Sequence, residues 1–352
     1  MNTVHTQTAA GFAALVAMTL AWAPTTIAEP ASATTASTQP AYPHVWLSDE
    51  QVRLLVYLPD AKTGYYRSSR FDWSGMIGRA EYGGHTFFGE WNAAHDPTVE
   101  THGIGTAEEF GMEQPLGFDE AKPGEPFVKI GVGLVARRDR RPYRFYNPHK
   151  VLQPGQWQIE HGPGWITFRQ DLAGVRGWAY RYEKRIKIQA DPAGFVIVHL
   201  LENTGTKAID TNHYNHSFVI IDDAPIDDRY HFVFPFEAAS RRDDPNAKVR
   251  YEGNSIIIES WVDPEGIWLD LAGLQHTVAE NRATVMNLRT GAGIAFEGEL
   301  PVERYWLWSV PTVGCVEPFV RIRLQPGQSK QWKIRYRFCV EPSAATSRKA
   351  QK

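Results

Sequence analysis

The sequence predicts an all-β protein, most simply a large antiparallel β-sandwich, and three observations support this prediction. Aromatic residues favour strands and make up 12% of the 352 residues, and the 29 glycines and 23 prolines favour turns between them. Short segments in which apolar and polar residues alternate recur along the chain. No long segment has the 3.6-residue periodicity of an amphipathic helix.

The start of the chain has the pattern of an export signal. An apolar run from Ala9 to Trp22 is too short to span a bilayer, and the small-residue site Thr26-Ile27-Ala28 follows it. No Lys or Arg precedes the run, which departs from the usual pattern. We expect residues 1–28 to be a signal peptide and residues 29–43 a flexible linker. The mature protein is then periplasmic or secreted, with no membrane contact.

The strands follow one another along a single expected domain, residues 44–341. Its first segment, Ser48–Leu55, has the Ser48 and Gln51 of a helical capping box, but its alternation favours a strand. Composition does not change across the domain, and a disordered tail is expected at residues 342–352. Turn signals such as Asn203-Thr204-Gly205 separate the later segments. Those that alternate as strands are Trp165–Arg169, Tyr180–Gln189, Phe195–Glu202, Ser217–Asp222, Ser255–Val262 and Tyr305–Val310.

The last two strands are predicted to form a hairpin. Val320–Leu324 and Trp332–Phe338 alternate on either side of the turn signal at residues 325–328. If their apolar faces are aligned, Cys315 lies opposite Cys339 and Glu317 lies opposite Arg337. The cysteines then form either a cross-strand disulfide or two buried thiols, and Glu317 is either half of an ion pair or free for chemistry.

Charge and motifs exclude several classes of function. Lys and Arg total 37 and Asp and Glu total 40, a net charge of -3, so the chain has no bulk electrostatic attraction for nucleic acid or an anionic membrane. It also lacks a phosphate-binding loop, a dinucleotide fingerprint, a nucleophile elbow and a paired-cysteine zinc motif. We therefore expect no nucleic-acid partner, no cofactor and no metal.

Two clusters contain residue types suited to acid–base chemistry. The segment Thr211–Phe218 holds His213 and His216, which face opposite sides of a regular strand and so do not converge on one metal ion. The segment Val313–Phe319 places Glu317 in apolar surroundings. Desolvation there raises the pKa of a carboxyl group and makes it a better general base.

The order of these segments resembles the aldose 1-epimerase and hexose-6-phosphate mutarotase superfamily. The resemblance rests on a strand with Lys184, the turn Asn203-Thr204-Gly205, a strand with a histidine before an aromatic residue, and Cys-Val-Glu-Pro at 315–318 ahead of Leu324–Gln328. It covers residues 125–338 and implies a galactose mutarotase-like supersandwich. It also implies that His216 is the general acid and Glu317 the general base. His213 is the alternative acid, because the Thr-Asn-His pattern of the epimerases also fits residues 211–213.

Residues outside these two clusters complete an expected sugar site. Arg67 and Arg70 lie in the segment Tyr65–Gly75, and His85, Glu109 and Tyr214 are further candidates for binding hydroxyl groups. Nearby aromatic side chains offer faces on which a pyranose ring stacks. The competing interpretation of Arg67 and Arg70 is a surface ion-pair network.

The leading hypothesis is an exported mutarotase that interconverts the anomers of a sugar or of an oligosaccharide's reducing end by acid–base catalysis. Two alternatives stay open, because a fold does not determine a function. A polysaccharide lyase acting on a uronate-containing glycan would use Tyr214 or a histidine as base, with Arg67 or Arg70 on the carboxylate. The basic run Arg137–Arg141 favours such an anionic substrate. The second alternative is a non-catalytic carbohydrate-binding protein.

Overall fold

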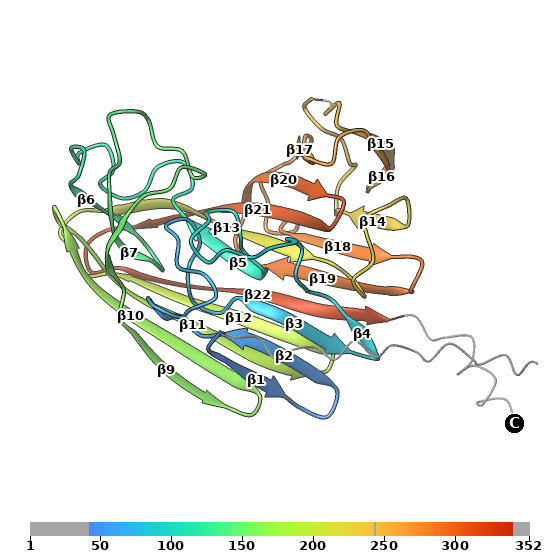
Figure 1. Cartoon of the computed structure of the whole chain (residues 1–352), viewed down its shortest axis with the longest axis horizontal. Helices are drawn as coiled ribbons and strands as arrows, with labels where there is room; N and C mark the ends of the chain where they lie inside the picture. The colour runs from blue at the N-terminus through green and yellow to red at the C-terminus, as the bar shows by residue number, and fades with distance from the viewer. Residues whose placement is uncertain (1–41, 243, 341–352) are drawn as a thin grey trace, which may run out of the picture. The chain divides into compact units, whose positions relative to one another are not determined.

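Strands dominate the computed structural model, which describes residues 42–242 and 244–340 (Figure 1). In this part of the chain, 22 strands form two large and two small antiparallel sheets, so the predicted all-β class is confirmed. The predicted signal peptide, the predicted tail and all but the last two residues of the predicted linker lie outside the described residues. No described segment forms a helix with the length and hydrophobicity that crossing a bilayer requires.

The larger sheet has ten strands in the order β15, β16, β14, β18, β19, β22, β12, β11, β10, β9. Residues of its central strands alternate between buried and accessible, as expected of a sheet with one face on the core and one in water. On β11, for example, Ile186 is buried and Arg185 is exposed. The strands of this sheet are β9 (Trp157–Gly162), β10 (Trp165–Val175), β11 (Trp178–Ala190), β12 (Ala193–Asn203), β14 (Tyr230–Val233), β15 (Ala247–Glu252), β16 (Ser255–Trp261), β18 (Arg282–Asn287), β19 (Ala292–Gly298) and β22 (Ser329–Val340).

The second large sheet has five strands in the order β17, β20, β21, β13, β5. Its central strands are buried on both faces along much of their length, and their buried residues include polar ones. Buried polar groups need partners, so this sheet is where a functional site is to be sought. Its strands are β5 (Gly105–Phe110), β13 (Ile209–Val219), β17 (Ile267–Asp270), β20 (Val302–Val310) and β21 (Val313–Leu324).

Two small sheets extend the hydrophobic packing. Leu54 and Val56 of the four-stranded sheet belong to the same buried cluster as Ile166 and Phe195 of the ten-stranded sheet. The three-stranded sheet contributes Phe127 to a second buried cluster. These sheets consist of β1 (His44–Ser48), β2 (Val52–Tyr57), β3 (Ile77–Tyr82) and β4 (His85–Thr86), and of β6 (Pro126–Lys129), β7 (Gly133–Ala136) and β8 (Val151–Pro154).

The main core includes inward-facing side chains of both large sheets. Ile197 and Tyr336 of the ten-stranded sheet share a buried cluster with Leu307 and Val316 of the five-stranded sheet. Burial of each such side chain stabilises the fold by roughly 1.5–3 kcal/mol. Because successive residues of a strand face opposite sides, the neighbours of Leu307 and Val316 point away from this core. The residues of the candidate site are among these neighbours.

The predicted hairpin of the last two strands is wrong. Strand β21 pairs with β13 and β20, and strand β22 pairs with β12 and β19, so the two strands belong to different sheets. The turn at residues 325–328 is present, but its backbone bonds to a neighbouring strand: Gly327 donates to the carbonyl of Asn203, and Asn203 donates to the carbonyl of Gln328. The chain therefore turns from one sheet into the other.

The register inferred from that hairpin is wrong with it. Cys315 lies opposite Trp308 and Phe218, whereas Cys339 lies opposite Gly293 in the other sheet, and both are free thiols. Glu317 lies opposite Trp306 rather than Arg337. The cross-strand disulfide and the Glu317–Arg337 ion pair are therefore absent from the described structure.

Candidate functional site

Strands β13 and β21 bring His216 and Glu317 into contact. Tyr214 pairs with Phe319 and Ser217 pairs with Val316, a register that places His216 across from Glu317. The Nε2 atom of His216 lies 3.2 Å from Oε1 of Glu317, and both side chains are buried. The structure therefore brings together the two residues expected to act as acid and base.

This pair lies at a pocket of about 430 Å³ whose wall is mainly aromatic. Trp306 and Trp308 come from β20, where they face away from the core because Leu307 between them faces into it. Aromatic faces pack well against the apolar face of a pyranose ring. The pocket is lined by Arg70, Thr101, Phe145, His216, Phe218, Trp268, Trp306, Trp308 and Glu317.

Arg70 is the cationic residue among the lining side chains, and buried partners hold its guanidinium in place. Its Nε atom donates to Glu109 at 3.0 Å, and its Nη2 atom donates to the hydroxyl of Tyr214 at 2.7 Å. Glu109 also accepts from Tyr214 at 2.8 Å and from Lys129 at 2.8 Å. Burial lowers the pKa of Arg70, but the contacts with Tyr214 and Glu109 outweigh it and raise that pKa above its ordinary value. Arg70 therefore presents a fixed positive charge at the pocket.

Burial shifts both members of the acid–base pair towards their neutral forms. Burial raises the pKa of Glu317 to about 8, with nearby Arg70 opposing the shift. It also lowers the pKa of His216 well below its ordinary value, and the positive charge of Arg70 adds to that effect. At neutral pH the resting pair therefore holds one proton, on Glu317, within reach of His216.

The structure places His213 outside this pocket. It is buried on the opposite face of β13, where its Nε2 atom lies 3.8 Å from Oε1 of Glu108 and its ring packs against Trp332. Burial lowers the pKa of His213 to about 3, so it is neutral at any ordinary pH. As predicted from strand alternation, the two histidines do not converge, and His213 does not face the pocket as an alternative acid.

The surroundings of His213 include three groups with the chemistry of metal ligands. Single ligand atoms of Glu108, His199 and His213 lie within 4.8 Å of one another. However, Nζ of Lys184 lies 2.7 Å from Oε2 of Glu108 and 2.7 Å from Asp72, so an ammonium group already pairs with both carboxylates. A metal ion there would face this positive charge, and the donor set fits a structural ion-pair cluster better than a metal site.

The remaining predicted binding residues divide into supporting and distant ones. Glu109 and Tyr214 do not line the pocket but hold Arg70. Arg67 bonds to the carbonyl of Lys62, and His85 pairs with Asp222 at 2.8 Å, so these two side chains are engaged outside the pocket. Arg67 and His85 were expected to bind sugar hydroxyl groups, but neither lines this pocket, because residue type alone does not indicate which way a side chain faces.

The basic run Arg137–Arg141 also has local partners. Arg137 donates to backbone carbonyls, including those of Phe118 and Ala121, and Asp139 pairs with Arg138 and Arg141. None of these residues lines the pocket. The run keeps a net positive charge, but because it lies outside the pocket it does not indicate an anionic substrate there.

Sequence reasoning missed most of the aromatic wall. Trp268, Trp306 and Phe145 are only partly buried, although large aromatic residues are usually core residues. A signal was available in Trp306-Leu307-Trp308, where a buried strand position is flanked by two tryptophans on the other face. Phe145 and Thr101 come from irregular segments, and no periodic pattern marks them.

Comparisons with known proteins identify the fold. No family model matches the chain, and no curated protein matches its sequence. Among solved structures it is similar to the Slr1438 protein of Synechocystis, with a TM-score of 0.51, 12% identity and coverage of 87% of this chain and 99% of that one. A galactose mutarotase-like protein from Lactobacillus casei has a TM-score of 0.51 at 10% identity, with 84% and 99% covered. A galactose mutarotase related enzyme from Lactobacillus acidophilus has a TM-score of 0.50 at 8% identity, with 85% and 100% covered.

Proposed function

We propose that this chain, which has the galactose mutarotase-like fold, is an isomerase that interconverts the anomers of an aldose. The observation that carries the proposal is the contact between His216 and Glu317 at an aromatic pocket beside Arg70. The pocket thus contains an acid–base pair, a fixed cation and apolar faces for a sugar ring. In the proposed reaction the protein exchanges only protons with the sugar, which is what an acid–base pair supplies.

The proposed reaction is ring opening and reclosure. Glu317 takes the proton of the anomeric hydroxyl while His216 gives a proton to the ring oxygen, so that the bond between C1 and the ring oxygen breaks. Rotation about the C1–C2 bond then exposes the other face of the aldehyde. Reclosure with the two proton transfers reversed yields the other anomer. Arg70 and Thr101 are placed to hold hydroxyl groups, and Trp306 and Trp308 to pack against the ring.

One proton shared between the two side chains is sufficient for this cycle. The resting pair is neutral with the proton on Glu317, and transfer across the 3.2 Å contact gives the carboxylate and imidazolium that the first step requires. Sugar hydroxyls that donate to the carboxylate favour that charged form. The pair keeps its single proton up to about pH 8, because burial raises the pKa of Glu317 to about 8.

Two finer points belong to the same proposal. The apolar run and small-residue site at the start of the chain support export, so we place the reaction in the periplasm or outside the cell. Of the two bases that the lyase alternative offers, Tyr214 does not line the pocket, because its hydroxyl bonds to Arg70 and Glu109; a lyase would therefore need His216 as its base beside Arg70. A non-catalytic sugar-binding protein is the remaining alternative, and the assay below distinguishes it.

The test is mutarotation of several pure aldose anomers followed by polarimetry. We expect the protein to accelerate the approach to equilibrium for at least one aldose. Glu317→Gln keeps the shape of the side chain but removes the base, so we expect it to lower the catalysed rate by roughly 10²- to 10⁴-fold. Glu160→Gln is the matched control, because Glu160 is exposed on β9 and pairs with Arg169 away from the pocket.

Two further measurements make the result decisive. Thermal unfolding of each variant shows whether lost activity reflects lost structure, and His216→Asn offers a second route to the same loss. An unchanged rate in a folded Glu317→Gln variant contradicts the mechanism. Sugar binding measured by calorimetry, without acceleration for any aldose, instead identifies a binding protein.

A further inference from the structure

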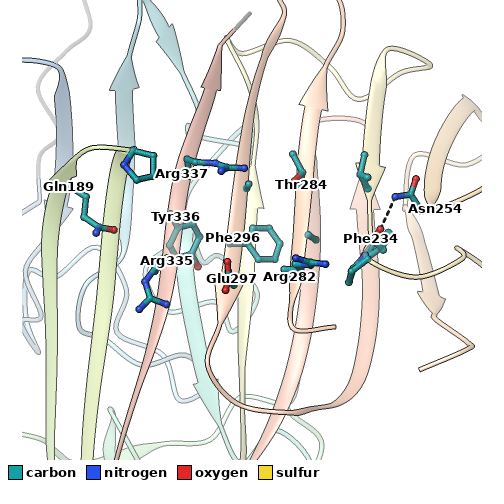
Figure 2. A pocket seen from close by; sticks show the side chains of 15 residues that line it. Gln189, Phe234, Asn254, Arg282, Thr284, Phe296, Glu297, Arg335, Tyr336 and Arg337 are labelled. Atoms are coloured by element: carbon teal, nitrogen blue, oxygen red, sulfur yellow. Dashed lines mark hydrogen bonds between the residues drawn. The ribbon is translucent and has the colours of Figure 1, made fainter. Parts of the chain in front are cut away.

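The outer face of the ten-stranded sheet carries a second hollow, which shares no lining residue with the aromatic pocket. The second hollow has a volume of about 590 Å³. Figure 2 shows the side chains that line it, among them Arg335, Glu297 and Arg282 from separate strands. An adjoining hollow of about 450 Å³ reaches Lys187 and shares Gln189 and Arg335 with the first. We call the two together the arginine groove. Tyr336 beside Arg335 belongs to the core, so the groove opens on the face away from the five-stranded sheet and its pocket.

The groove is built by alternation between strands. The pairing register runs from Lys187 on β11 to Val196 on β12, Arg335 on β22, Glu297 on β19 and Arg282 on β18. Long basic side chains thus come from every second strand, and shorter ones lie between them. In the next row only β22 contributes a basic side chain, Arg337; Gly194 and Ala295 lie on either side of it, and β11 and β18 contribute Gln189 and Thr284. Small residues such as Gly194 and Ala295 thus form the floor of the groove, and the longer basic side chains form the ridges beside it.

Of the four basic residues in these two rows, Arg335 pairs with Glu299 at 2.9 Å, whereas Lys187, Arg282 and Arg337 differ from other basic residues on the same sheet face in having no acidic partner in the described part of the chain. Arg169 pairs with Glu183 at 2.7 Å, and Arg181 pairs with Asp171 at 2.8 Å. Among the described residues, in contrast, no carboxylate oxygen lies within 4.0 Å of the charged groups of Lys187, Arg282 or Arg337. Glu297 lies in the same register row as Arg282 and Arg335 without an ion pair to either. Unpaired cations gathered over a hollow attract an anionic ligand.

The spacing of these cations indicates a polymer rather than a small anion. Neighbouring strands lie about 4.8 Å apart, so the basic ridges on β11, β22 and β18 follow one another at intervals of about 10 Å. A single carboxylate or phosphate can bridge only one of these intervals in part. A linear chain that crosses the strands meets successive ridges with successive charges.

The chemistry of the groove favours an acidic polysaccharide over nucleic acid. Glu297 lies among the arginines, where it accepts from hydroxyl groups but repels a densely charged phosphate backbone. Thr284, Gln189 and Asn254 add neutral polar groups, as Figure 2 shows.

We propose that the arginine groove binds a linear polysaccharide that carries carboxylates, as a site separate from the aromatic pocket. The choice of a glycan as the source of the carboxylates rests on the proposed function, whereas the cationic character of the groove does not. Such a site would keep the protein on an acidic glycan while the pocket on the other face acts on a sugar end.

The test measures binding of the full chain to polygalacturonate by calorimetry at low salt, with uncharged dextran as the neutral comparison. We expect binding to polygalacturonate, weakened at higher salt because the ion pairs are exposed, and no binding to dextran. The double variant Arg282→Gln/Arg337→Gln should bind at least about fivefold more weakly. The double variant Arg169→Gln/Arg181→Gln removes the same charge from the same sheet face outside the groove, and it should bind within about twofold of the wild type.

Three outcomes overturn the proposal: no binding to polygalacturonate, equal losses in the two double variants, or tighter binding to single-stranded DNA than to polygalacturonate. Mutarotation by the groove variant is measured in parallel and should be unchanged. Because the binding measurement does not depend on turnover, failure of the groove and failure of the proposed reaction are separate results.

Discussion

At the scale of single residues, Glu317 combines a chemical advantage with a cost in stability. Its carboxyl group is buried beside tryptophans, and burial raises its pKa from 4.5 to about 8. Glu317 therefore stays protonated in the folded protein at pH values at which it is ionised in the unfolded chain. The folded state therefore binds one more proton than the unfolded state across this range, and its stability falls as pH rises.

We predict that Glu317→Gln stabilises the protein by an amount that grows with pH. The stability difference should increase by about 1.4 kcal/mol per pH unit between pH 5 and pH 7 and level off towards pH 8, where Glu317 itself ionises in the folded wild type, whereas the amide does not titrate. Urea unfolding of both proteins at pH 5, 6, 7 and 8 measures the slope.

The control for this slope is Glu160→Gln, because the carboxylate of Glu160 is exposed and its replacement removes no buried group. A difference between wild type and Glu317→Gln that stays constant with pH would mean that Glu317 ionises normally. In that case the proton-sharing step of the proposed mechanism has no basis.

At the scale of single elements, strands could be predicted wherever one face of the strand is buried and the other is exposed to solvent. The alternation of β10, β11, β12, β16 and β20 is visible in the sequence because those strands have two different faces. The strand predicted at Ser217–Asp222 begins earlier in the structure, because β13 starts at Ile209. The residues of β13 are buried on both faces, so polar side chains such as Asn215 interrupt any alternation.

Partner choice was harder to predict than strand position. Local alternation states which face of a strand is apolar, but not which strand lies beside it. Matching the apolar faces of β21 and β22 produced a register for a pair that does not exist. The turn between β21 and β22 is instead bonded by Asn203, the last residue of β12, which lies nine strands before β21 in the sequence.

The thiols provide a direct check of that topology. Because Cys315 and Cys339 lie in different sheets, we predict two free thiols per chain. Protein purified without reductant and unfolded in guanidinium should react with two equivalents of a thiol reagent. Reductant should leave the melting temperature unchanged, and a lowered melting temperature would show that the cysteines pair after all.

Part of the site was predictable at this scale, and part was not. The resemblance selected His216 and Glu317, and strand alternation separated His213 from them. Arg70 was predicted to bind substrate, and it lines the pocket. Glu109 and Tyr214 were predicted to bind substrate as well, but they lie on two other strands and contact Arg70 instead. Sequence spacing cannot show whether a charged side chain faces a ligand or another side chain.

At the scale of the whole molecule, a buried charged cluster connects the two large sheets. Lys184 of β11 contacts Glu108 of β5 at 2.7 Å and Asp72 at 2.7 Å, and it donates to the carbonyl of Ser74 at 2.8 Å. His199 of β12 completes the cluster through Glu108 at 2.9 Å. These residues are buried, so each charge depends on the others.

We predict that Lys184→Met destabilises the protein by about 3–5 kcal/mol, because it leaves two buried carboxylates without their cation. Chemical unfolding measures the loss. Lys187→Met is the matched control: it lies on the same strand, faces water, and should change stability by less than about 0.5 kcal/mol. Equal stabilities for the two variants would mean that the cluster carries little energy.

Glu108 and Glu109 are neighbours on β5 that serve different networks, one between the sheets and the other behind the pocket. A slip of β5 by one residue along β13 would put Ala107 in the place of Glu108 in one direction, or Phe110 in the place of Glu109 in the other. Lys184 would then lose one of its two carboxylates, or Arg70 would lose Glu109, so a slip in either direction carries an electrostatic penalty. The edge strand beside the pocket, which hydrogen bonds alone would allow to shift, is held in a single register by adjacent acidic residues.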